Sequence, residues 1–532
     1  MLLVAVPIGH WPIHAADDTL AAYAAGALVK AGDPERGRQL FFDERLKCAV
    51  CHRVAGRGGS TGPDLTHVGA KLDRPHLVES LLEPSRQVLQ GYETRIVETH
   101  DGRVLQGIVR EESPAGLLMV DAEGREHRVA AGDIAQVRTS DVSLMPAGWQ
   151  QLMTQSEFVD LVAFLESLGG GRNTPGSAVS GPLHMPPGIA ARTVATGLTG
   201  AVALEVTPDR RVLICEQTGT LRVVQHDQLL PEPAIRLEVD SYWERGLIGV
   251  TVDPQFPARP LVYLCYVKAR PFPHHVVSRF TMHGNRLLAD SEQVLLEGDD
   301  QRQYAGQVPA GHQGGALHFG PDGALYIAIG EHTAGQPAQQ LDSFLGKILR
   351  INPDGSIPKD NPFFETLSGK YRAIWAYGFR NPFTFAFDRT GRWMLINDVG
   401  GAQEEINQGE PGANYGWPRV DHGRPPPDGI RGALYSYPQA SVAGGDFVPA
   451  DSPWPRDWWG KYLFGDFVLG KLFLLDPNSR QVTELVSGLR RPVDLRFAGD
   501  GSLYVLQRNA WVIDNHFQPA TGSLLKLTWA GP

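Results

Sequence analysis

Apolar residues in the first third of the chain recur at helical spacing in three stretches. A helix is expected over Pro34–Phe41, because Asp33 suits the capping position and Pro suits the first turn. A second helix is expected over Pro75–Leu82 and ends before Pro84. A third begins at the capping box Thr154-Gln155-Ser156-Glu157. Its apolar face is formed by Phe158, Leu161, Val162, Leu165 and Leu168, and Gly169 is the stop signal.

Between the second and third helices the pattern changes to the alternation of β-strands. Two turns, Asp101-Gly102 and Glu123-Gly124, separate apolar runs of strand length. The sequence therefore predicts a small β-module, at about residues 92–140, inserted among the helices. Its expected strands are Thr94–Thr99, Val104–Arg110, Leu117–Asp121, Glu126–Ala130 and Ile134–Arg138.

From Ile189 onward, short apolar strands follow turns rich in Asp and Gly, and this unit repeats. TPDRRVLICEQ, GPDGALYIAIGE and AGDGSLYVLQRN are three examples, and second strands such as GKILRINPDG close the units. A four-stranded unit that recurs about every fifty residues is typical of a β-propeller blade, and the spacing leaves room for six. The turn aspartates are Asp209, Asp253, Asp322, Asp388 and Asp500.

Length and charge limit the possible functions. The chain has 532 residues, enough for two or three domains, with 49 basic against 59 acidic residues and a net charge of −10. It has no basic block, which argues against nucleic acid or an anionic membrane as a partner. It also has no apolar run long enough to span a bilayer. Residues 1–30 have a short apolar core but lack the usual early Lys or Arg, so we expect a leader or weak export signal there.

Cys48-Ala49-Val50-Cys51-His52 is the attachment signature of haem c, in which two thiols bond to the haem and the His binds the iron. A zinc site would need a second Cys pair, and a redox dithiol would need a βαβ context, which this sequence lacks. The other cysteines, Cys215 and Cys265, lie on strands of neighbouring units and either form a disulfide or stay as buried thiols. Because bacteria attach haem c outside the cytoplasm, we expect a periplasmic or secreted protein.

Met145, followed by Pro146, lies on the predicted loop before the third helix and is expected to be the second iron ligand. A thioether suits a low-spin electron-transfer haem. The alternatives are that Met145 only packs, or that another side chain binds the iron. The rival residues are Met185, His67 and His76, whereas Met119 and Met153 are expected to pack.

Three helices around this motif resemble a class I cytochrome c. The stretches GPDLTHVGAK, EPSRQV, GYE, DGRVLQGIV and SLMPAG resemble the planctomycete/verrucomicrobial-type haem-binding domain over about residues 33–169. The expected organisation is multidomain and mainly α, then all β. It comprises a leader (1–30), a cytochrome c domain with its β insertion (31–170), a linker rich in Gly, Pro and Ser (171–188) and a six-bladed propeller (189–532).

The repeat region carries further motifs, among them ERGLIGVTVDPQF, GHQGGALHFGPDGALYIAIGE, IWAYGFRNPFTFAFD, NDVGGAQEEIN, GANYGWP and RPVDLRFAGDGSLYVL. Together they resemble the glucose/sorbosone dehydrogenase family, which includes soluble quinoprotein glucose and aldose dehydrogenases. The resemblance implies a six-bladed propeller whose central mouth holds pyrroloquinoline quinone (PQQ) on Ca²⁺.

Oxidation of a sugar hydroxyl needs a base for the O–H proton and an acceptor for the hydride. The resemblance implies that His312, on a Gly-flanked turn, is that base. Glu331 stands where the family usually has Asp, and we expect it to orient His312 or stabilise its charge. The alternative is that His312 only fills a hydrogen-bonded propeller core.

The three carboxylates of PQQ need cationic partners, and forked guanidinium groups suit them. The matching family positions are Arg380, Asn381 and Arg491, together with Glu244, where the glucose enzyme has Gln. The resemblance places Ca²⁺ on the backbone carbonyls of Gly400 and Gly401, with Glu405 either a further ligand or a surface carboxylate.

Two positions depart from the family pattern. Val493 replaces a second Arg, and Val468 stands where the family has Lys. The nearby Lys471 does not replace that Lys, because it is expected to face elsewhere. Fewer cations imply weaker PQQ affinity, a different placement, or no PQQ.

Two functions fit this sequence. The first is an exported quinohaemoprotein dehydrogenase that oxidises an aldose or a related alcohol or aldehyde and passes electrons through its haem to an external acceptor, such as another cytochrome or an oxidase. The second is a non-redox Ca²⁺-dependent propeller, a lactonase or carbohydrate-binding module, tethered to an electron-transfer cytochrome. His312 with Arg380 and Arg491 favours the first, whereas the missing Arg and Lys favour the second.

Overall fold

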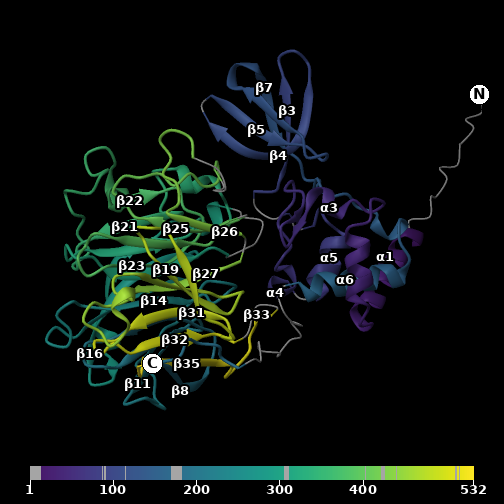
Figure 1. The fold of residues 1–532 in the computed structure, drawn as a ribbon. Coiled ribbons are helices and arrows are strands. Elements are labelled where there is room, and N and C mark those ends of the chain that lie inside the picture. The colour runs from purple at the N-terminus through teal and green to yellow at the C-terminus, as the bar shows by residue number, and fades with distance from the viewer. Residues whose placement is uncertain are drawn as a thin grey trace, which may run out of the picture.

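A large all-β domain lies beside a smaller helical domain, and a separate small β-sheet borders both (Figure 1). None of the described helices is both long and apolar enough to cross a bilayer. The computed structural model describes residues 14–72, 74–86, 88, 91–113, 115–168, 182–304, 311–401, 403–420, 426–438, 440–509, 512–513 and 516–531.

The helical domain is built around α6 (Gln155–Ser167), whose residues 158–165 are all buried. The predicted capping box is present, because the Thr154 side chain accepts from the Glu157 N–H and Glu157 accepts from the Thr154 N–H. The other two expected helices are α2 (Pro34–Phe41), capped by Asp33, and α5 (Arg74–Leu82). The expected stop at residue 169 lies outside the described residues. Two further helices are short, α3 (Cys48–Cys51) and α4 (Val68–Lys71).

Close packing of α2 on α6 depends on Gly37. A Cβ at this position would lie 1.9 Å from the Asp160 carbonyl oxygen, so only glycine permits the contact. Beside it, the buried Asp160 carboxylate accepts from the Asp33 N–H at 2.7 Å and from Arg36 Nε at 3.0 Å. The hydrogen bonds therefore satisfy the one buried charge on this face of α6.

Part of the segment predicted as a leader forms a helix that packs on this domain. Helix α1 (His14–Val29) packs against α5 and α6, and Ala27 is completely buried. Leu20, Tyr23 and Ala24 pack against the same core. These positions are spaced as one helical face, a pattern that the sequence analysis passed over.

The inserted β-module forms one antiparallel sheet in the order β6-β5-β4-β3-β7. Its own small core contains Val97, Leu117, Met119 and Val129. All five predicted strands are present, within a few residues of their expected bounds. They are β3 (Thr94–Thr99), β4 (Val104–Ser113), β5 (Gly116–Val120), β6 (Glu126–Ala130) and β7 (Ile134–Thr139). A separate two-stranded ribbon, β1 (Arg53–Val54) with β2 (Arg57–Gly58), follows the haem motif.

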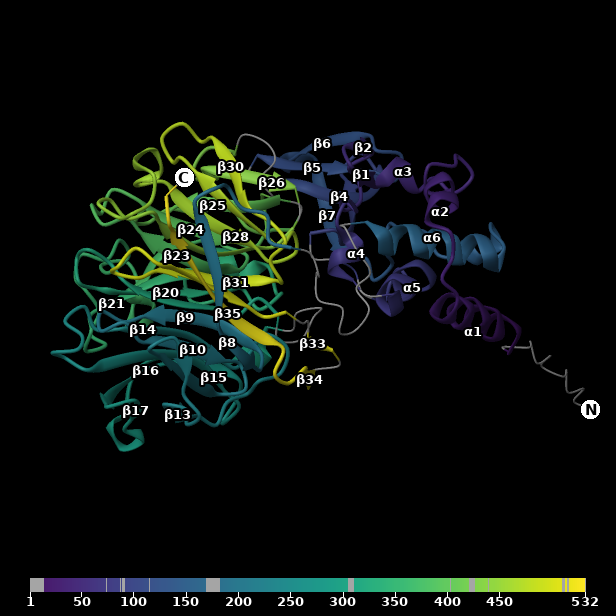
Figure 2. The same ribbon diagram turned by 60° about the horizontal axis from the view of Figure 1, so that its bottom comes forward.

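The large domain contains six antiparallel sheets of four or five strands within the described residues. The first strands of successive sheets contact one another, and β31 contacts β9, so these strands form a closed ring. The last sheet is completed by β8 from the start of the domain, which pairs with β35 (Figure 2). The strands of the first three sheets are β9 (Ala201–Val206), β10 (Val212–Glu216), β11 (Thr220–Gln225), β12 (Gln228–Leu229) and β13 (Ile235–Arg236); β14 (Leu247–Val252), β15 (Leu261–Lys268), β16 (His274–His283), β17 (Arg286–Leu287) and β18 (Gln293–Glu297); and β19 (Gly314–Phe319), β20 (Leu325–Ile329), β21 (Lys347–Ile351) and β22 (Ile374–Tyr377).

The remaining sheets complete the ring. Their strands are β23 (Pro382–Phe387), β24 (Met394–Asp398), β25 (Gln403–Gln408) and β26 (Tyr435–Pro438); β27 (Val442–Phe447), β28 (Tyr462–Asp466), β29 (Lys471–Leu475) and β30 (Val482–Val486); and β31 (Pro492–Phe497), β32 (Leu503–Gln507), β35 (Gly522–Trp529) and β8 (Ile189–Leu198). A short ribbon of β33 (Val512–Ile513) and β34 (His516–Phe517) lies outside the sheets.

The end of the predicted linker belongs to the large domain. His184 and Ser487 exchange two backbone hydrogen bonds of 3.0 Å, and Leu183 and Met185 pack against the core that contains β29 and β31. Residues 169–181 lie outside the described residues.

In each sheet the first two strands are antiparallel, so the start of the first and the end of the second meet at one edge. His312 precedes β19 and Glu331 follows β20. Arg380 precedes β23 and Arg491 precedes β31. The topology therefore gathers these residues, distant in sequence, at one mouth of the ring.

Candidate active site

His312 and Glu331 form a hydrogen-bonded pair at this mouth. His312 Nδ1 lies 2.5 Å from Glu331 Oε1, and the Glu331 side chain is fully buried while 12% of the His312 side chain is exposed. Burial raises the pKa of Glu331, but the hydrogen bond and charge of His312 outweigh it and hold that pKa below its usual value. An ionised Glu331 accepts the proton on Nδ1, which leaves Nε2 as the basic atom.

Two segments distant in sequence, at Glu244 and at Gly330–His332, hold His312 in a strained backbone conformation. Its φ is 51°, in the left-handed region that non-glycine residues rarely adopt. Its N–H donates to Glu244 Oε2 at 2.8 Å, and its carbonyl accepts from the His332 N–H at 3.2 Å. A Cβ on Gly330 would lie 2.2 Å from that carbonyl oxygen. The surrounding structure therefore fixes the imidazole tightly.

Arg380 and Asn381 are held by one buried carboxylate. Their N–H groups donate to Asp398 at 3.1 and 2.6 Å. Burial raises the pKa of Asp398 to about 7, although these two hydrogen bonds oppose the shift. The guanidinium of Arg380 donates to the Val399 carbonyl at 2.9 Å and lies 5.3 Å from the centre of the Trp417 ring. Its buried Nε finds no acceptor among the described residues, so one cationic N–H remains for a ligand.

Arg491 and Arg508 form a second cationic group. Arg491 is 6% exposed, has φ 55°, and lies 5.6 Å from the Phe467 ring centre. Its carbonyl accepts from the Arg508 N–H at 3.0 Å. Burial, and to a smaller extent the charge of Arg508, lower the pKa of Arg491 to about 10. Burial also lowers the pKa of Arg508 to about 10, against the opposing charge of Glu244.

Sequence analysis missed Arg508. The signal was its position, because Arg508 directly follows β32 as Glu331 closely follows β20, and strand ends of this kind meet at the mouth. The two apolar departures are buried in the core, with Val493 2% and Val468 6% exposed. Lys471 faces elsewhere, as expected, and donates to Glu484 at 2.7 Å.

The predicted calcium loop is tightly folded. A Cβ on Gly400 would lie 1.5 Å from the Gln403 carbonyl oxygen, which explains the glycine. Glu405 is 6% exposed, so its interpretation as a surface carboxylate is wrong, and its side chain accepts from Asn407 Nδ2 at 3.1 Å. Among the described residues, no cluster of three or more acidic, His or Cys side chains is placed to hold a metal. Any calcium there would depend on backbone carbonyls, including that of Gly401.

The haem signature lies on one turn of helix. Cys48 and Cys51 are both free thiols at the two ends of α3, and His52 follows directly. His52 Nδ1 lies 2.9 Å from the Pro63 carbonyl, which leaves Nε2 for iron. Burial lowers the pKa of His52 and keeps the imidazole neutral. A Cβ on Gly62 would lie 2.6 Å from His52 Cε1, so glycine leaves the imidazole room. These residues fit a covalently bound haem.

Among the methionines, Met145 is half-buried and packs against the helical core that also includes Cys48. Met185 packs against the large β domain, and Met119 is fully buried inside the β-module. Met153 is buried in the helical core, as expected. Of the two rival histidines, His67 is half-buried and directly precedes α4, and His76 is exposed on α5. Cys215 and Cys265 are free and buried, so of the two alternatives the buried thiols are present.

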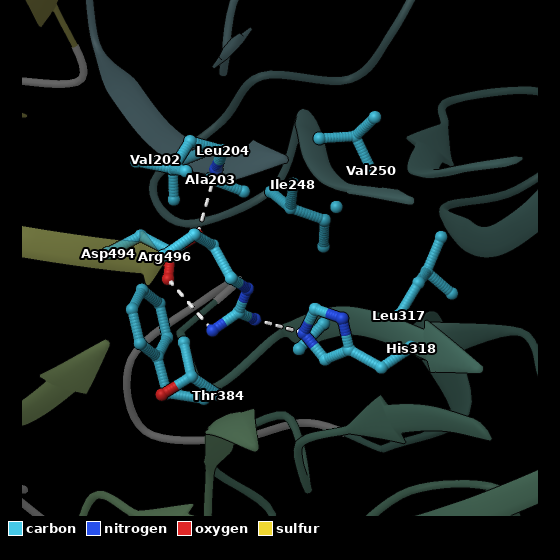
Figure 3. A pocket seen from close by; sticks show the side chains of 13 residues that line it. Val202, Ala203, Leu204, Ile248, Val250, Leu317, His318, Thr384, Asp494 and Arg496 are labelled. Carbon is cyan, nitrogen blue, oxygen red and sulfur yellow. Dashed lines mark hydrogen bonds and ion pairs between the residues drawn. The ribbon is translucent and has the colours of Figure 1, made fainter. Parts of the chain in front are cut away.

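The centre of the ring holds a small pocket whose polar residues the sequence did not reveal (Figure 3). Arg496 lies between Asp494 and His318 and donates to the His318 ring. Asp494 in turn accepts from the Leu204 N–H at 2.8 Å. Burial raises the pKa of the neighbouring Glu205 to about 7, which the charge of Arg496 opposes. These buried polar groups are partners for one another. Their contacts link β31 to β9 and to β19, the first strands of three sheets.

Comparison with known proteins agrees with this geometry. The Glucose / Sorbosone dehydrogenase family model matches residues 198–511, and the Cytochrome c model matches residues 34–102. The chain belongs to the glucose/sorbosone dehydrogenase family, with a cytochrome c domain at its N-terminal side. The resemblances to a cytochrome c and to the glucose/sorbosone dehydrogenase family are therefore confirmed.

Two of the relatives are sugar dehydrogenases by name. Aldose sugar dehydrogenase YliI of Escherichia coli is 31% identical over 333 residues, 57% of this chain and 86% of that protein. Quinoprotein glucose dehydrogenase B of Acinetobacter calcoaceticus is 28% identical over 263 residues, 43% of this chain and 52% of that protein. A solved structure of a glucose dehydrogenase-type oxidoreductase from Thermus thermophilus superposes with a TM-score of 0.56 at 28% identity, covering 64% of this chain and all of that one.

Proposed function

We propose that this protein is an exported quinohaemoprotein dehydrogenase that oxidises an aldose or a related alcohol or aldehyde at the mouth of a six-bladed β-propeller. The six sheets are the blades, and the His312–Glu331 pair beside the buried arginines is the observation that carries the proposal. Export follows from the haem signature, since haem c is attached outside the cytoplasm.

His312 is the general base in this proposal. Its Nε2 takes the substrate hydroxyl proton, and the ionised Glu331 at Nδ1 stabilises the imidazolium that forms. Glu244 holds the backbone of His312 and thereby fixes the direction of the ring. The hydroxyl proton thus leaves along a fixed path.

Three guanidinium groups, from the buried Arg380 and Arg491 and the half-buried Arg508, match the three carboxylates of PQQ. Val493 of β31 stands where the family has a second Arg. Arg508, which directly follows the neighbouring strand β32, supplies a cation in its place. Asn381 and Glu244 complete the polar set, and the carbonyls of Gly400 and Gly401 with Glu405 are the proposed calcium ligands. When bound, PQQ supplies the hydride acceptor.

Cys48 and Cys51 bond to the haem in this proposal, and His52 and Met145 bind its iron. The haem supplies a one-electron acceptor that passes electrons to an external protein.

Reconstitution tests the proposal. The haem-loaded protein, given PQQ and Ca²⁺, should oxidise aldoses with an artificial dye as acceptor. Arg508→Met should weaken PQQ binding in a titration, whereas Arg490→Met, at the exposed residue next to Arg491, should not. If PQQ does not bind, or no aldose or alcohol is oxidised, the protein is better explained as a Ca²⁺-dependent hydrolase or carbohydrate binder.

A further inference from the structure

The inserted β-module contacts both candidate sites. Figure 2 shows its strands between β26 of the propeller and the region of α3, which carries the haem cysteines. A module inserted only to lengthen the cytochrome would need neither contact. Its position between the two domains places it where it can join the two candidate sites (Figure 2).

On the propeller side, the module meets the segment that follows β25. Glu111 forms an antiparallel β-bridge with Val420, and the Glu112 N–H donates to the Arg419 carbonyl at 3.2 Å. A Cβ on Gly91 would lie 3.6 Å from Cη2 of Trp417. That indole is the one that lies over Arg380.

Glu93, just before β3, lies within electrostatic range of Glu331. Its carboxylate accepts from the Gly91 N–H at 2.8 Å. Burial raises the pKa of Glu93, and the charge of Glu331 adds to that rise. The chain before β3 therefore approaches the His312–Glu331 pair.

On the haem side, the module covers the loop that follows the haem motif. Arg110 of β4 donates to the carbonyls of Ser60 and Thr61, the latter at 2.8 Å. The next residue is Gly62, which packs against the His52 ring. The Cys51 thiol lies 3.7 Å from the Ala122 carbonyl in the turn between β5 and β6.

One side-chain pair joins the two sets of contacts. The Arg110 guanidinium lies 5.0 Å from the centre of the buried Tyr92 ring, and Tyr92 is next to Gly91 in the chain. Contact is thus continuous from Trp417 through Gly91–Tyr92 and Arg110 to Gly62 and His52.

We propose that the inserted β-module is the internal docking surface that holds the haem loop against the propeller mouth, and that electrons pass between the two sites along the Trp417, Tyr92 and Arg110 contacts. The proposal rests on the dehydrogenase function stated above. Oxidation of one hydroxyl carbon to a carbonyl releases two electrons and two protons. Each electron in turn reduces one ferric haem to ferrous, and an external one-electron acceptor reoxidises the haem between the two transfers.

The docked geometry is tested by a disulfide in the haem-loaded protein, without PQQ. Facing residues of an antiparallel pair are spaced as a disulfide requires, so Glu111→Cys with Val420→Cys should crosslink under mild oxidation. The control pair is Arg103→Cys with Val420→Cys, because Arg103 precedes the opposite end of β4 and should not crosslink. Failure of the first pair, or equal crosslinking of both, would overturn the docking.

The route is tested by Arg110→Met, which keeps the apolar stem but removes the guanidinium. Substrate-driven haem reduction should slow by about tenfold or more, while dye reduction by the propeller and the haem midpoint potential stay unchanged. Arg128→Met, an exposed Arg of the same module, should change none of these. Unchanged haem reduction in Arg110→Met would reject the route. Dye reduction without haem reduction in the wild type would reject only the proposed electron transfer from the propeller to the haem. Loss of both would reject the dehydrogenase function.

Discussion

His52 and His312 are both held by a hydrogen bond at Nδ1, but their partners come from very different distances along the chain. Pro63, the partner of His52, is 11 residues away. His312 is paired with Glu331, 19 residues away, and its backbone is held by Glu244, 68 residues away. His52 is therefore oriented locally, whereas the His312 site exists only once several sheets have closed into a ring.

The two partners also give the two rings different chemistry. A backbone carbonyl carries no net charge, so the buried His52 stays neutral and suits a metal. A buried carboxylate beside His312 stabilises the protonated ring, which suits a base that accepts a proton. Removing either His should affect one site without the other.

His312→Ala should produce the largest effect. Loss of a positioned base should slow aldose oxidation by about 10² to 10⁴ in the dye-coupled assay. The haem spectrum should stay that of the wild type, because the hydrogen-bond partners of His312 in the described residues, Glu244, Glu331 and His332, all belong to the propeller. His283→Ala, on an exposed histidine of β16, is the control. Equal rates in the two variants would exclude His312 as the base.

Met145→Ala tests the other side of the comparison. Replacing the sulfur ligand should remove the near-infrared sulfur–iron band and lower the haem potential. Dye-coupled oxidation should be unaffected. Met185→Ala should leave the haem spectrum unchanged, since Met185 packs against the propeller. An unchanged band in Met145→Ala would mean that another residue is the sixth ligand.

Gly37→Ala should separate the stabilities of the two domains. The added Cβ meets the Asp160 carbonyl at 1.9 Å, and overpacking of this kind costs about 1–3 kcal/mol. The helical domain, followed by haem absorbance during denaturation, should unfold earlier while tryptophan fluorescence of the propeller does not change. Gly26→Ala, where a Cβ meets nothing within 4 Å, should not destabilise the domain. A joint shift of both transitions would show that the domains unfold as one unit.

Glu205 should make the stability of the propeller depend on pH. Its folded pKa of about 7 lies above the usual value for Glu, so the folded state holds a proton that the unfolded state has released. Stability is then greatest below the unfolded pKa and falls as the pH rises toward 7, by about 1.4 kcal/mol per pH unit. Glu205→Gln should flatten this slope in urea unfolding between pH 5 and 7. A slope that is the same in both proteins would remove Glu205 as its cause.

The local features of this molecule were predictable from sequence for a physical reason. The haem motif, the capping box at Thr154 and the strands of the β-module each depend on neighbours within a few residues. Helix α1 also carried a readable pattern, with Ala27 on the buried face, but the expectation of a leader concealed it.

Contacts between distant segments were not predictable in this way. Arg508 joins the candidate site only because β32 ends at the same mouth as β20, and that edge appears when the sheets form. The bridge between Glu111 and Val420 joins two domains, and neither of the two chain segments carries a sequence motif that predicts it. The family motifs identified the propeller residues because relatives with the same fold carry them.

The most direct test of the proposed function is a single turnover without an external acceptor. The oxidised haem-loaded protein, reconstituted with PQQ and Ca²⁺, is mixed anaerobically with an aldose while the haem α-band is recorded. The proposal predicts that the ferrous band rises with substrate and that His312→Ala abolishes the rise. A band that does not respond to any aldose or alcohol, in protein that has bound PQQ, would contradict the coupling of sugar oxidation to the fused haem.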